Sequence, residues 1–302
     1  MAATVTDVLA AYPDALERAA ARPFIIANRL YQLKTKKARA FANEAKYPFS
    51  NVPIDVILPA AIKDLEVLPY CIKGIVENVK HPITHIKIVA AASPEITAFC
   101  NKNKYIFVDE NNVSPIKKSS INYNVNGKNR SGWILQQLLK YSHDLSDEEH
   151  YLTVDTDTVL IRPQTYIRDG KTLVLTGDDY FPPYNRMIKK LFGYAPLIPK
   201  SLVCHQNFFA KTELIKMKKA IEQHTGKVWY QAILDNLDST NHVTFAENLT
   251  YAYWMCRNNR ESVVTEYYFN KGVKRSELSN FAELKARFQA NYKSISFQHY
   301  IK

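Results

Sequence analysis

Residues 151–163 constrain the fold of this chain more than any other stretch, because two carboxylates interrupt an apolar run there. The sequence of the stretch is Tyr-Leu-Thr-Val-Asp-Thr-Asp-Thr-Val-Leu-Ile-Arg-Pro. A continuous run of apolar, β-branched residues is typical of a strand buried in a parallel sheet. Residues i and i+2 of an extended chain point the same way, so Asp155 and Asp157 can face one pocket. Open α/β sheets bind ligands at the carboxyl ends of their strands, and the stretch therefore predicts a strand that ends in a ligand site.

The ligand that suits two such carboxylates is a hard divalent cation, Mg²⁺ or Mn²⁺, whose remaining positions go to substrate phosphates. The alternative is a turn or helix-capping role, since a chain of 302 residues contains about one Asp-x-Asp by chance. The apolar flanks favour the cation, because a buried carboxylate needs a partner.

Composition limits the class of protein. Hydrophobic residues make up 46% of the chain, which excludes disorder, and the net charge of +11 implies an anionic partner: nucleic acid, a phosphorylated substrate or an acidic membrane surface. The four cysteines are scattered without zinc spacing, as in a reduced cytoplasmic protein. No apolar run approaches the roughly 20 residues of a membrane span, so we expect a cytoplasmic chain, with membrane association on the cytoplasmic face as an open alternative.

We expect two parts, an N-terminal helical extension at residues 1–50 and a main domain at residues 51–302. The extension should break at Pro13 and Pro23 and continue as a basic helix over residues 24–46. That helix could lie on anionic lipid or pack on the main domain with a solvated basic face.

The main domain begins with alternating strands and helices. The expected strands are 54–58, 86–91 and 105–108, and the expected helices between them are 65–79 and 95–101. This alternation predicts an α/β fold with right-handed crossovers and a parallel sheet. A polar loop at 111–129 and a helix at 131–140 then lead into the Asp155 stretch.

The second half contributes further polar candidates. A strand at 172–175 ends near Asp178 and Asp179, and a loop at 182–200 includes a short helix at 187–192. A strand at 201–210 carries His205, Gln206 and Asn207, which either line the substrate or form the solvated face of an edge strand. A helix at 245–255 has Glu247 in its first turn, and His299 lies in a strand-like tail.

Together these motifs resemble the GT-A glycosyltransferases, more narrowly those of bacterial capsule or O-antigen polysaccharides. The resemblance covers residues 53–302 and is carried by Ile-Asp-Val-Ile-Leu-Pro at 54–59, by Arg-Ser-Gly-Trp-Ile-Leu-Gln-Gln-Leu-Leu-Lys at 130–140 and by the central Asp-x-Asp. It implies a Rossmann-like mixed sheet flanked by helices that binds a nucleotide-diphospho-sugar.

The resemblance also implies roles for individual residues. Pro59, Ala60 and Asp64 would hold the nucleotide, Asp155 the ribose or a metal-bound water, and Asp157 the metal, with His299 as a further ligand. The inverting members carry x-Glu-Asp beneath the sugar, where this chain has Ala246-Glu247-Asn248, so Glu247 would be the base without the usual Asp.

We therefore expect a Mn²⁺- or Mg²⁺-dependent glycosyltransferase that moves a sugar from a UDP-linked donor to a hydroxyl of a glycan or lipid-linked glycan, with inversion. Lys128 and Arg130 are candidates for donor phosphate contacts, and His205, Gln206, Asn207, Asp178 and Asp179 for lining the sugar and acceptor. One alternative is a nucleotidyltransferase or other nucleotide-sugar enzyme, although the chain has no Gly-rich phosphate loop. The other is a non-catalytic basic protein that binds nucleic acid or lipid, whereas the enzyme would have no nucleic acid partner.

Overall fold

The computed structural model describes residues 15–37, 42–113, 116–179, 181–194 and 201–298. Its centre is a five-stranded sheet in the order β10-β6-β1-β2-β3. The strands are β1 (Ile54–Pro59), β2 (Ile83–Ala90), β3 (Ile106–Asp109), β6 (His150–Val154) and β10 (Gln206–Ala210). Strands β6, β1, β2 and β3 are parallel, and β10 runs antiparallel to β6. The predicted mixed α/β sheet flanked by helices is confirmed.

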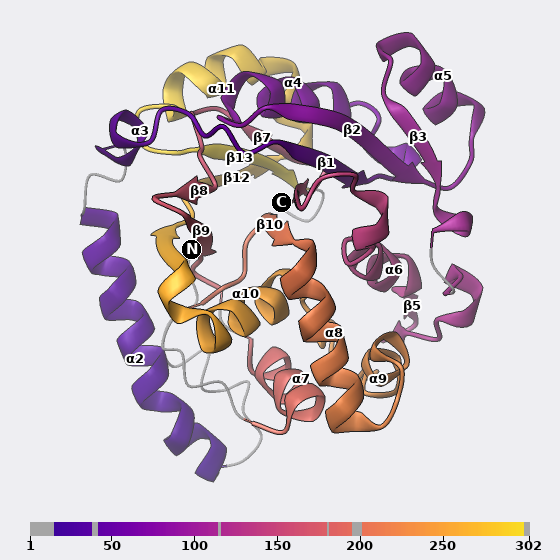
Figure 1. The fold of residues 1–302 in the computed structure, drawn as a ribbon, viewed down its shortest axis with the longest axis vertical. Helices are drawn as coiled ribbons and strands as arrows, with labels where there is room; N and C mark the ends of the chain where they lie inside the picture. The colour runs from indigo at the N-terminus through magenta and orange to yellow at the C-terminus, as the bar shows by residue number, and fades with distance from the viewer. Residues whose placement is uncertain (1–14, 38–41, 114–115, 180, 195–200, 299–302) are drawn as a thin grey trace.

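The connections between the parallel strands are helical, as the alternation of strands and helices in the sequence predicts. The crossover helices are α4 (Leu68–Asn78), α5 (Pro94–Asn103) and α6 (Ser131–Leu139). All six residues of β1 are buried because both faces of the sheet are covered. Figure 1 places α4 on one side of the sheet and α6 on the other.

The face of the sheet that carries α6 holds the larger apolar core. Four further helices pack there, namely α7 (Pro182–Phe192), α8 (Lys211–Thr225), α9 (Trp229–Asp235) and α10 (Glu247–Asn258). Tyr151 and Phe209 of the sheet stack on each other within this core, with ring centroids 5.0 Å apart. The opposite face packs against α4 through residues such as Leu152 and Phe208.

Two small sheets extend the molecule. One has the order β12-β13-β7, with β7 (Thr158–Leu160), β12 (Asn270–Lys274) and β13 (Ser294–Gln298). The other has the order β11-β9-β8, with β8 (Ile167–Arg168), β9 (Lys171–Thr176) and β11 (Val263–Tyr267). Helix α11 (Phe281–Phe288) covers the first of them together with part of α4.

Gly74 allows α4 to approach β7 closely. A Cβ at this position would lie 2.7 Å from the backbone oxygen of Leu160 and 2.9 Å from its nitrogen. No side chain fits between these backbones, so glycine is the residue that permits this packing.

Several predicted boundaries are wrong. Helix α2 (Ala15–Lys37) continues through Pro23, whose exposed ring costs the helix one backbone hydrogen bond without ending it. Helix α7 begins at Pro182 instead of 187, because two prolines suit the first turn of a helix. The predicted strand at 201–210 is regular only in β10, while Ser201 forms a single bridge to Gly177. Pro13 lies outside the described residues.

The predicted polar loop at 111–129 contains a hairpin of β4 (Asn124–Val125) and β5 (Lys128–Asn129). Its turn, Asn126-Gly127, has positive φ at both residues, which is the hairpin geometry that Asn-Gly favours. Tyr123 and Val125 are fully buried and attach the loop to the core beneath α6.

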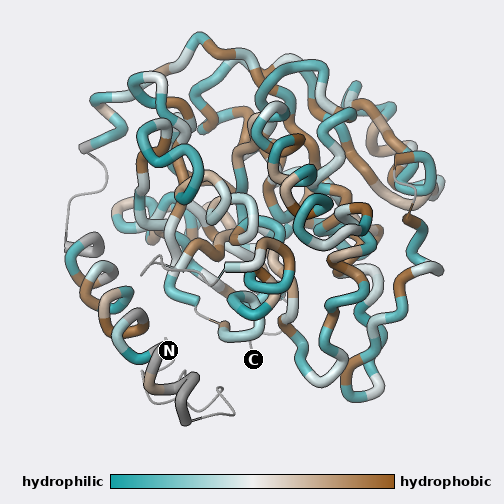
Figure 2. The backbone as a smooth tube through the Cα atoms, turned by 60° about the horizontal axis from the view of Figure 1, so that its bottom comes forward, coloured by the Kyte–Doolittle hydropathy of each residue, from teal (hydrophilic) through white to brown (hydrophobic). Residues whose placement is uncertain are grey.

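The N-terminal extension packs on the main domain through polar contacts and through the buried side chain of Ile25. In α3 (Ala42–Lys46), Glu44 accepts hydrogen bonds from the Arg162 guanidinium at 2.6 and 3.0 Å. Helix α2 stands at the edge of the molecule beside β11 (Figures 1 and 2). The division of the chain near residue 50 stays a prediction. None of the helices in the described part of the chain is long and apolar enough to cross a bilayer.

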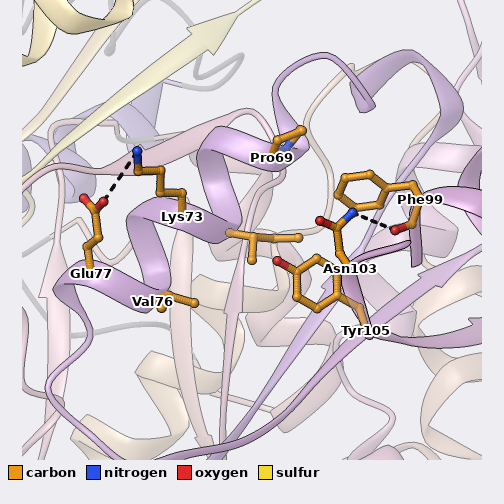
Figure 3. Close-up of a pocket in the computed structure, with 8 residues that line it drawn as sticks. Pro69, Lys73, Val76, Glu77, Phe99, Asn103 and Tyr105 are labelled. Atoms are coloured by element: carbon orange, nitrogen blue, oxygen red, sulfur yellow. Dashed lines mark hydrogen bonds and ion pairs between the residues drawn. The ribbon is translucent and has the colours of Figure 1, made fainter. Parts of the chain in front are cut away.

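A shallow pocket of about 320 Å³ lies between α4, α5 and the residues that follow α5 (Figure 3). Its lining includes Lys73, Val76, Phe99 and Tyr105. Lys73 is paired with Glu77, and none of the predicted site residues lines the pocket.

Candidate functional site

Asp155 and Asp157 lie in a tight turn where the chain leaves one sheet and enters another. Strand β6 ends at Val154 and β7 begins at Thr158, whose backbone N–H donates to the Asp155 carbonyl at 2.8 Å. The prediction of one continuous strand is therefore wrong, because β6 pairs in the central sheet whereas β7 pairs with β13. The predicted convergence of the two carboxylates still occurs, since the turn brings them together. Ligand atoms of Asp155, Asp157 and His205 all lie within 4.8 Å of one another. We call these three residues the carboxylate-imidazole cluster.

The backbone of this turn is held from two sides. The Asp155 N–H donates to the His205 carbonyl at 2.8 Å, next to β10. The Phe297 N–H donates to the Asp157 carbonyl at 2.8 Å, from β13. Segments far apart in the sequence thus fix the positions of the two carboxylates.

Asp64 fixes the middle of the turn. It is buried, and it accepts hydrogen bonds from the Thr156 hydroxyl at 3.2 Å and from the Arg275 guanidinium at 3.0 Å. Each of its carboxylate oxygens therefore already has a partner within the protein. Its described contacts orient the turn, whereas the resemblance implied a contact with the nucleotide.

His205 belongs to the cluster through its Nδ1 atom. This atom lies 3.8 Å from Asp155 Oδ2, and 3.2 Å from both the Thr158 and the Ser296 hydroxyl oxygens. The two hydroxyls are 2.8 Å apart. The sequence interpretation assigned His205 to the sugar, but the structure places it beside the paired carboxylates. Thr158 and Ser296 were not predicted, since isolated hydroxyl residues in strands give no sequence signal.

The negative charge of the cluster is compensated only in part by its described partners. Burial raises the pKa of Asp157 above its usual range, the neighbouring Asp155 raises it further, and His205 opposes the rise. Two carboxylates and an imidazole offer oxygen and nitrogen ligands to a divalent metal. The donor set and the excess negative charge both fit a divalent cation.

Lys140 connects the cluster to Glu247. Its ammonium donates to Asp155 Oδ1 at 2.6 Å and to Glu247 Oε1 at 2.7 Å. Burial alone would lower the pKa of Lys140, but the two carboxylates outweigh burial and raise it, so Lys140 is a permanent cation. A lysine after an apolar helix gave no sequence signal, because such lysines usually complement the helix dipole in solvent.

Glu247 lies in the first turn of α10, as predicted, although the helix begins at Glu247 instead of residue 245, and its side chain is buried. Its backbone N–H donates to Gln137 Oε1 at 3.1 Å, and its carbonyl accepts from the Tyr141 hydroxyl at 2.7 Å. Gln137 lies in α6, and Tyr141 follows this helix by two residues. The start of α10 is thus attached to the helix region that also supplies Lys140.

The side chains of Gln206 and Asn207, which follow His205, lie in different environments. Gln206 is buried and accepts a hydrogen bond from the Tyr166 hydroxyl, on the face of the sheet that packs against α4. The Asn207 side-chain nitrogen is buried and has no hydrogen-bond partner among the described residues. The three predicted side chains do not share one pocket, because successive residues of a strand alternate between its faces.

Asp178 and Asp179 follow β9, as expected. Asp178 accepts a hydrogen bond from the Tyr267 hydroxyl at 2.7 Å. Burial raises the pKa of Asp179, and His205 is near enough to oppose that rise. Asp179 therefore lies within electrostatic range of the carboxylate-imidazole cluster.

The remaining predicted residues lie in three separate parts of the chain. Pro59 and Ala60 are buried at the carboxyl end of β1. Lys128 is exposed on the small hairpin, and the Arg130 guanidinium stacks 4.3 Å from the Trp133 ring centre at the start of α6. His299 lies outside the described residues.

Comparisons with known proteins gave one sequence family and several distant structures. A model described as "Family of unknown function (DUF6492)" matches residues 80–295. A search of curated proteins found no significant match.

Three of the similar solved structures are glycosyltransferases. Galactosyltransferase LgtC, solved with donor and acceptor sugar analogues, is 13% identical over 82% of this chain and 88% of its own, with a TM-score of 0.43. Mouse xyloside xylosyltransferase 1 is 10% identical over 82% and 98%, with a TM-score of 0.45. GlyE of Streptococcus pneumoniae TIGR4 is 9% identical over 83% and 56%, with a TM-score of 0.38. At these identities and TM-scores, a function for this chain has to rest on its own side chains.

Proposed function

The chain belongs to the DUF6492 family of unknown function, and we propose that it is a metal-dependent glycosyltransferase that moves a sugar from a nucleotide-sugar donor to a hydroxyl of a glycan acceptor. The observation that carries this proposal is the convergence of Asp155, Asp157 and His205 within 4.8 Å at the carboxyl end of β6. Ligands bind at this edge in open α/β sheets. UDP is the proposed nucleotide and Mn²⁺ or Mg²⁺ the proposed cation.

The cation would be held by Asp157, His205 and the Asp155 oxygen that Lys140 leaves available. When bound, it would neutralise the negative charge that develops on the departing diphosphate. Arg130 and Lys128 add positive charge near the start of α6 and are proposed to contact the donor phosphates. The net charge of +11 suits a phosphorylated substrate.

The residues of the chain itself position the reacting groups. Thr156, Asp64 and Arg275 form a chain of hydrogen bonds that orients the turn. Lys140 donates to Asp155 Oδ1 at 2.6 Å and fixes the direction of its carboxylate. Such preorganisation lowers the cost of reorientation during the reaction.

Glu247 is proposed as the general base of an inverting transfer, as the resemblance implies. A second role is favoured by its 2.7 Å contact with Lys140, because the ammonium already occupies one of its carboxylate oxygens. In that role Glu247 restrains Lys140 and is a positioning residue for Asp155. Asp178, Asp179 and Asn207 are the proposed sugar-lining and acceptor-lining residues.

The proposal is tested by incubating the protein with a panel of nucleotide sugars and measuring nucleotide release with Mn²⁺, with Mg²⁺ and with EDTA. We expect release of UDP from one donor, dependent on the cation, and faster release when a glycan acceptor is added. Release of pyrophosphate from a sugar phosphate and a nucleoside triphosphate would point to a nucleotidyltransferase. No cation-dependent product from any donor would contradict the proposal.

The Glu247→Gln variant separates the two roles of Glu247. If Glu247 is the base, turnover falls by roughly 100-fold or more and the Mn²⁺ concentration needed for activity is unchanged. If it is a positioning residue, the freed Lys140 pairs more closely with Asp155 and the variant needs more Mn²⁺. The anomeric configuration of the product, measured by NMR, tests inversion independently.

A further inference from the structure

Helix α2 has two apolar faces, and only one of them is covered. Ile25 is 2% exposed and faces the main domain. On the other side, Ile26, Leu30 and Leu33 are 42%, 62% and 58% exposed. Residues spaced by three and four lie on one side of a helix, so these three form a continuous stripe. Figure 2 shows α2 at the edge of the molecule, with hydrophobic and hydrophilic residues alternating along it.

Positive charge accompanies this stripe. The sequence of α2 has six basic residues and one acidic residue, a net charge of 6 − 1 = +5, which is nearly half of the net +11 of the chain. Arg22 and Lys34 are exposed. At 100° per residue, Arg22 projects from the same side as Ile26, and Lys34 lies beside Leu30. An apolar stripe flanked by cations is the pattern of a helix that lies in the interface of an anionic bilayer.

The other side of α2 is attached to the main domain. The Asn28 side-chain oxygen is buried and accepts a hydrogen bond from the Ser201 N–H at 2.7 Å. Tyr31 contacts the Thr265 hydroxyl of β11 at 3.4 Å. Arg29 is near enough to Asp179 to oppose the rise in its pKa that burial causes. The inner face of α2 therefore lies near Asp179, one of the proposed lining residues.

We propose that the outer face of α2 docks the protein onto an anionic phospholipid surface, with Ile26, Leu30 and Leu33 inserted among the lipids and the neighbouring basic residues on the headgroups. A second copy of the chain fits less well, because it would bring together two segments of +5. The docking does not depend on the proposed enzymatic activity. If that activity holds, docking brings the site to membrane-bound acceptors.

Sedimentation with lipid vesicles tests the proposal. The full-length protein is mixed with vesicles of pure phosphatidylcholine or of phosphatidylcholine with phosphatidylglycerol, at low and at high salt. We expect binding to the anionic vesicles that weakens at high salt, because screening reduces the attraction of the basic residues. The double variant Leu30→Gln, Leu33→Gln should bind at least about tenfold more weakly, since it removes apolar area from the bilayer.

The matched control is the double variant Val76→Gln, Val228→Gln. Val76 lies in α4 and is 57% exposed, and Val228 directly precedes α9 and is 49% exposed. It should bind as the unchanged protein does, and both double variants should keep the unchanged melting temperature. Equal binding of the Leu30, Leu33 variant and the unchanged protein would overturn the proposal. So would an absence of binding to anionic vesicles, or a dimer in analytical ultracentrifugation that the Leu30, Leu33 variant abolishes.

Discussion

Two groups of two aspartates and one histidine lie at opposite ends of the same sheet. Asp155, Asp157 and His205 gather at the carboxyl end of β6. Asp55, His85 and Asp147 gather at the amino ends of β1, β2 and β6, also with their ligand atoms within 4.8 Å of one another. The two groups have the same composition, so the difference between them lies in what surrounds them.

The carboxylate of Asp55 is fully buried and already has several partners. It accepts a hydrogen bond from the Asp147 N–H at 2.6 Å and one from the Ser146 hydroxyl at 3.3 Å. His85 Nδ1 is 3.2 Å away and the Lys87 ammonium is 3.7 Å away. Lys87 also donates to Asp147 at 2.7 Å and lowers its pKa. The Asp55 group is therefore a compensated structural network.

The Asp157 group is compensated much less. Among the described residues, the buried ammonium of Lys140 is shared by Asp155 and Glu247, and the pKa of Asp157 is raised by burial and by Asp155. The comparison teaches that residue types alone do not identify a metal site. The hydrogen-bond donors and cations around each group distinguish the paired ion network from the candidate cation site.

The largest expected effect is on turnover. Asp157→Asn removes a metal ligand without changing volume, and we expect sugar transfer to fall by at least about 100-fold at saturating Mn²⁺. Nucleotide release measures this, and a melting curve checks that the fold is kept. Activity retained at saturating Mn²⁺ would remove Asp157 from the metal site.

The next effect is on stability at the other end of the sheet. Asp55→Asn leaves Lys87 without one of its two carboxylates and places an uncharged amide beside the Asp147 N–H and the Lys87 ammonium. Breaking a buried charged network of this kind costs about 3 kcal/mol in the free energy of unfolding. Urea unfolding measures the loss. A change below about 1 kcal/mol would mean that this group is no more compensated than the other.

A smaller effect of opposite sign is expected for Asp157 in the absence of metal. Its folded-state pKa is raised above the ordinary value of 3.8, so the folded protein binds the proton more tightly than the unfolded chain does. Stability is therefore lost as the pH rises through the window between 3.8 and the folded-state pKa. Asp157→Asn removes this loss, and at pH 7 in EDTA the variant should be more stable by about 0.5–2 kcal/mol. Urea unfolding of both proteins at acidic and neutral pH measures this difference in the free energy of unfolding. A less stable variant at pH 7 would contradict the conclusion that the charge of Asp157 is only partly compensated.

The smallest effect is expected for Asp147. Its pKa is lowered by the hydrogen bond from Lys87, so its contribution is present at neutral pH and is lost as the pH falls through the lowered pKa. Its side chain is 64% exposed, and solvent screens the pair. We expect Asp147→Asn to leave the melting temperature at pH 7 nearly unchanged. A loss as large as that of Asp55→Asn would show that the pair with Lys87 is effectively buried.

The sheet could be predicted because its signals are local. The apolar strands, the helices between them and the Asp-x-Asp each lie within a short window of sequence. The break at Asp155 could not be predicted, since β6 and β7 are equally apolar and only their pairing partners differ. The continuation of helix α2 through Pro23 could not be predicted either, because packing on the main domain outweighs the tendency of proline to end a helix.

The contacts of the site depend on long-range packing, which the sequence pattern does not display. Lys140 and Glu247 are 107 residues apart, and Asp64 and Thr156 are 92 apart. Each of these residues has an ordinary local explanation, as a helix end or a turn. His205 was selected for its polarity, but its position beside Asp155 follows from the antiparallel pairing of β10 with β6.

The strand that closes the Asp155–Asp157 turn is among the last described residues of the chain. The backbone of Phe297 bonds to Asp157, and Ser296 contacts both Thr158 and His205. During synthesis the central sheet, complete at Ala210, is available well before β13 has been made. A chain that stops before β13 would keep the whole central sheet and lack the strand that holds the turn. The strands of the central sheet are therefore synthesised before the strand that completes the candidate site.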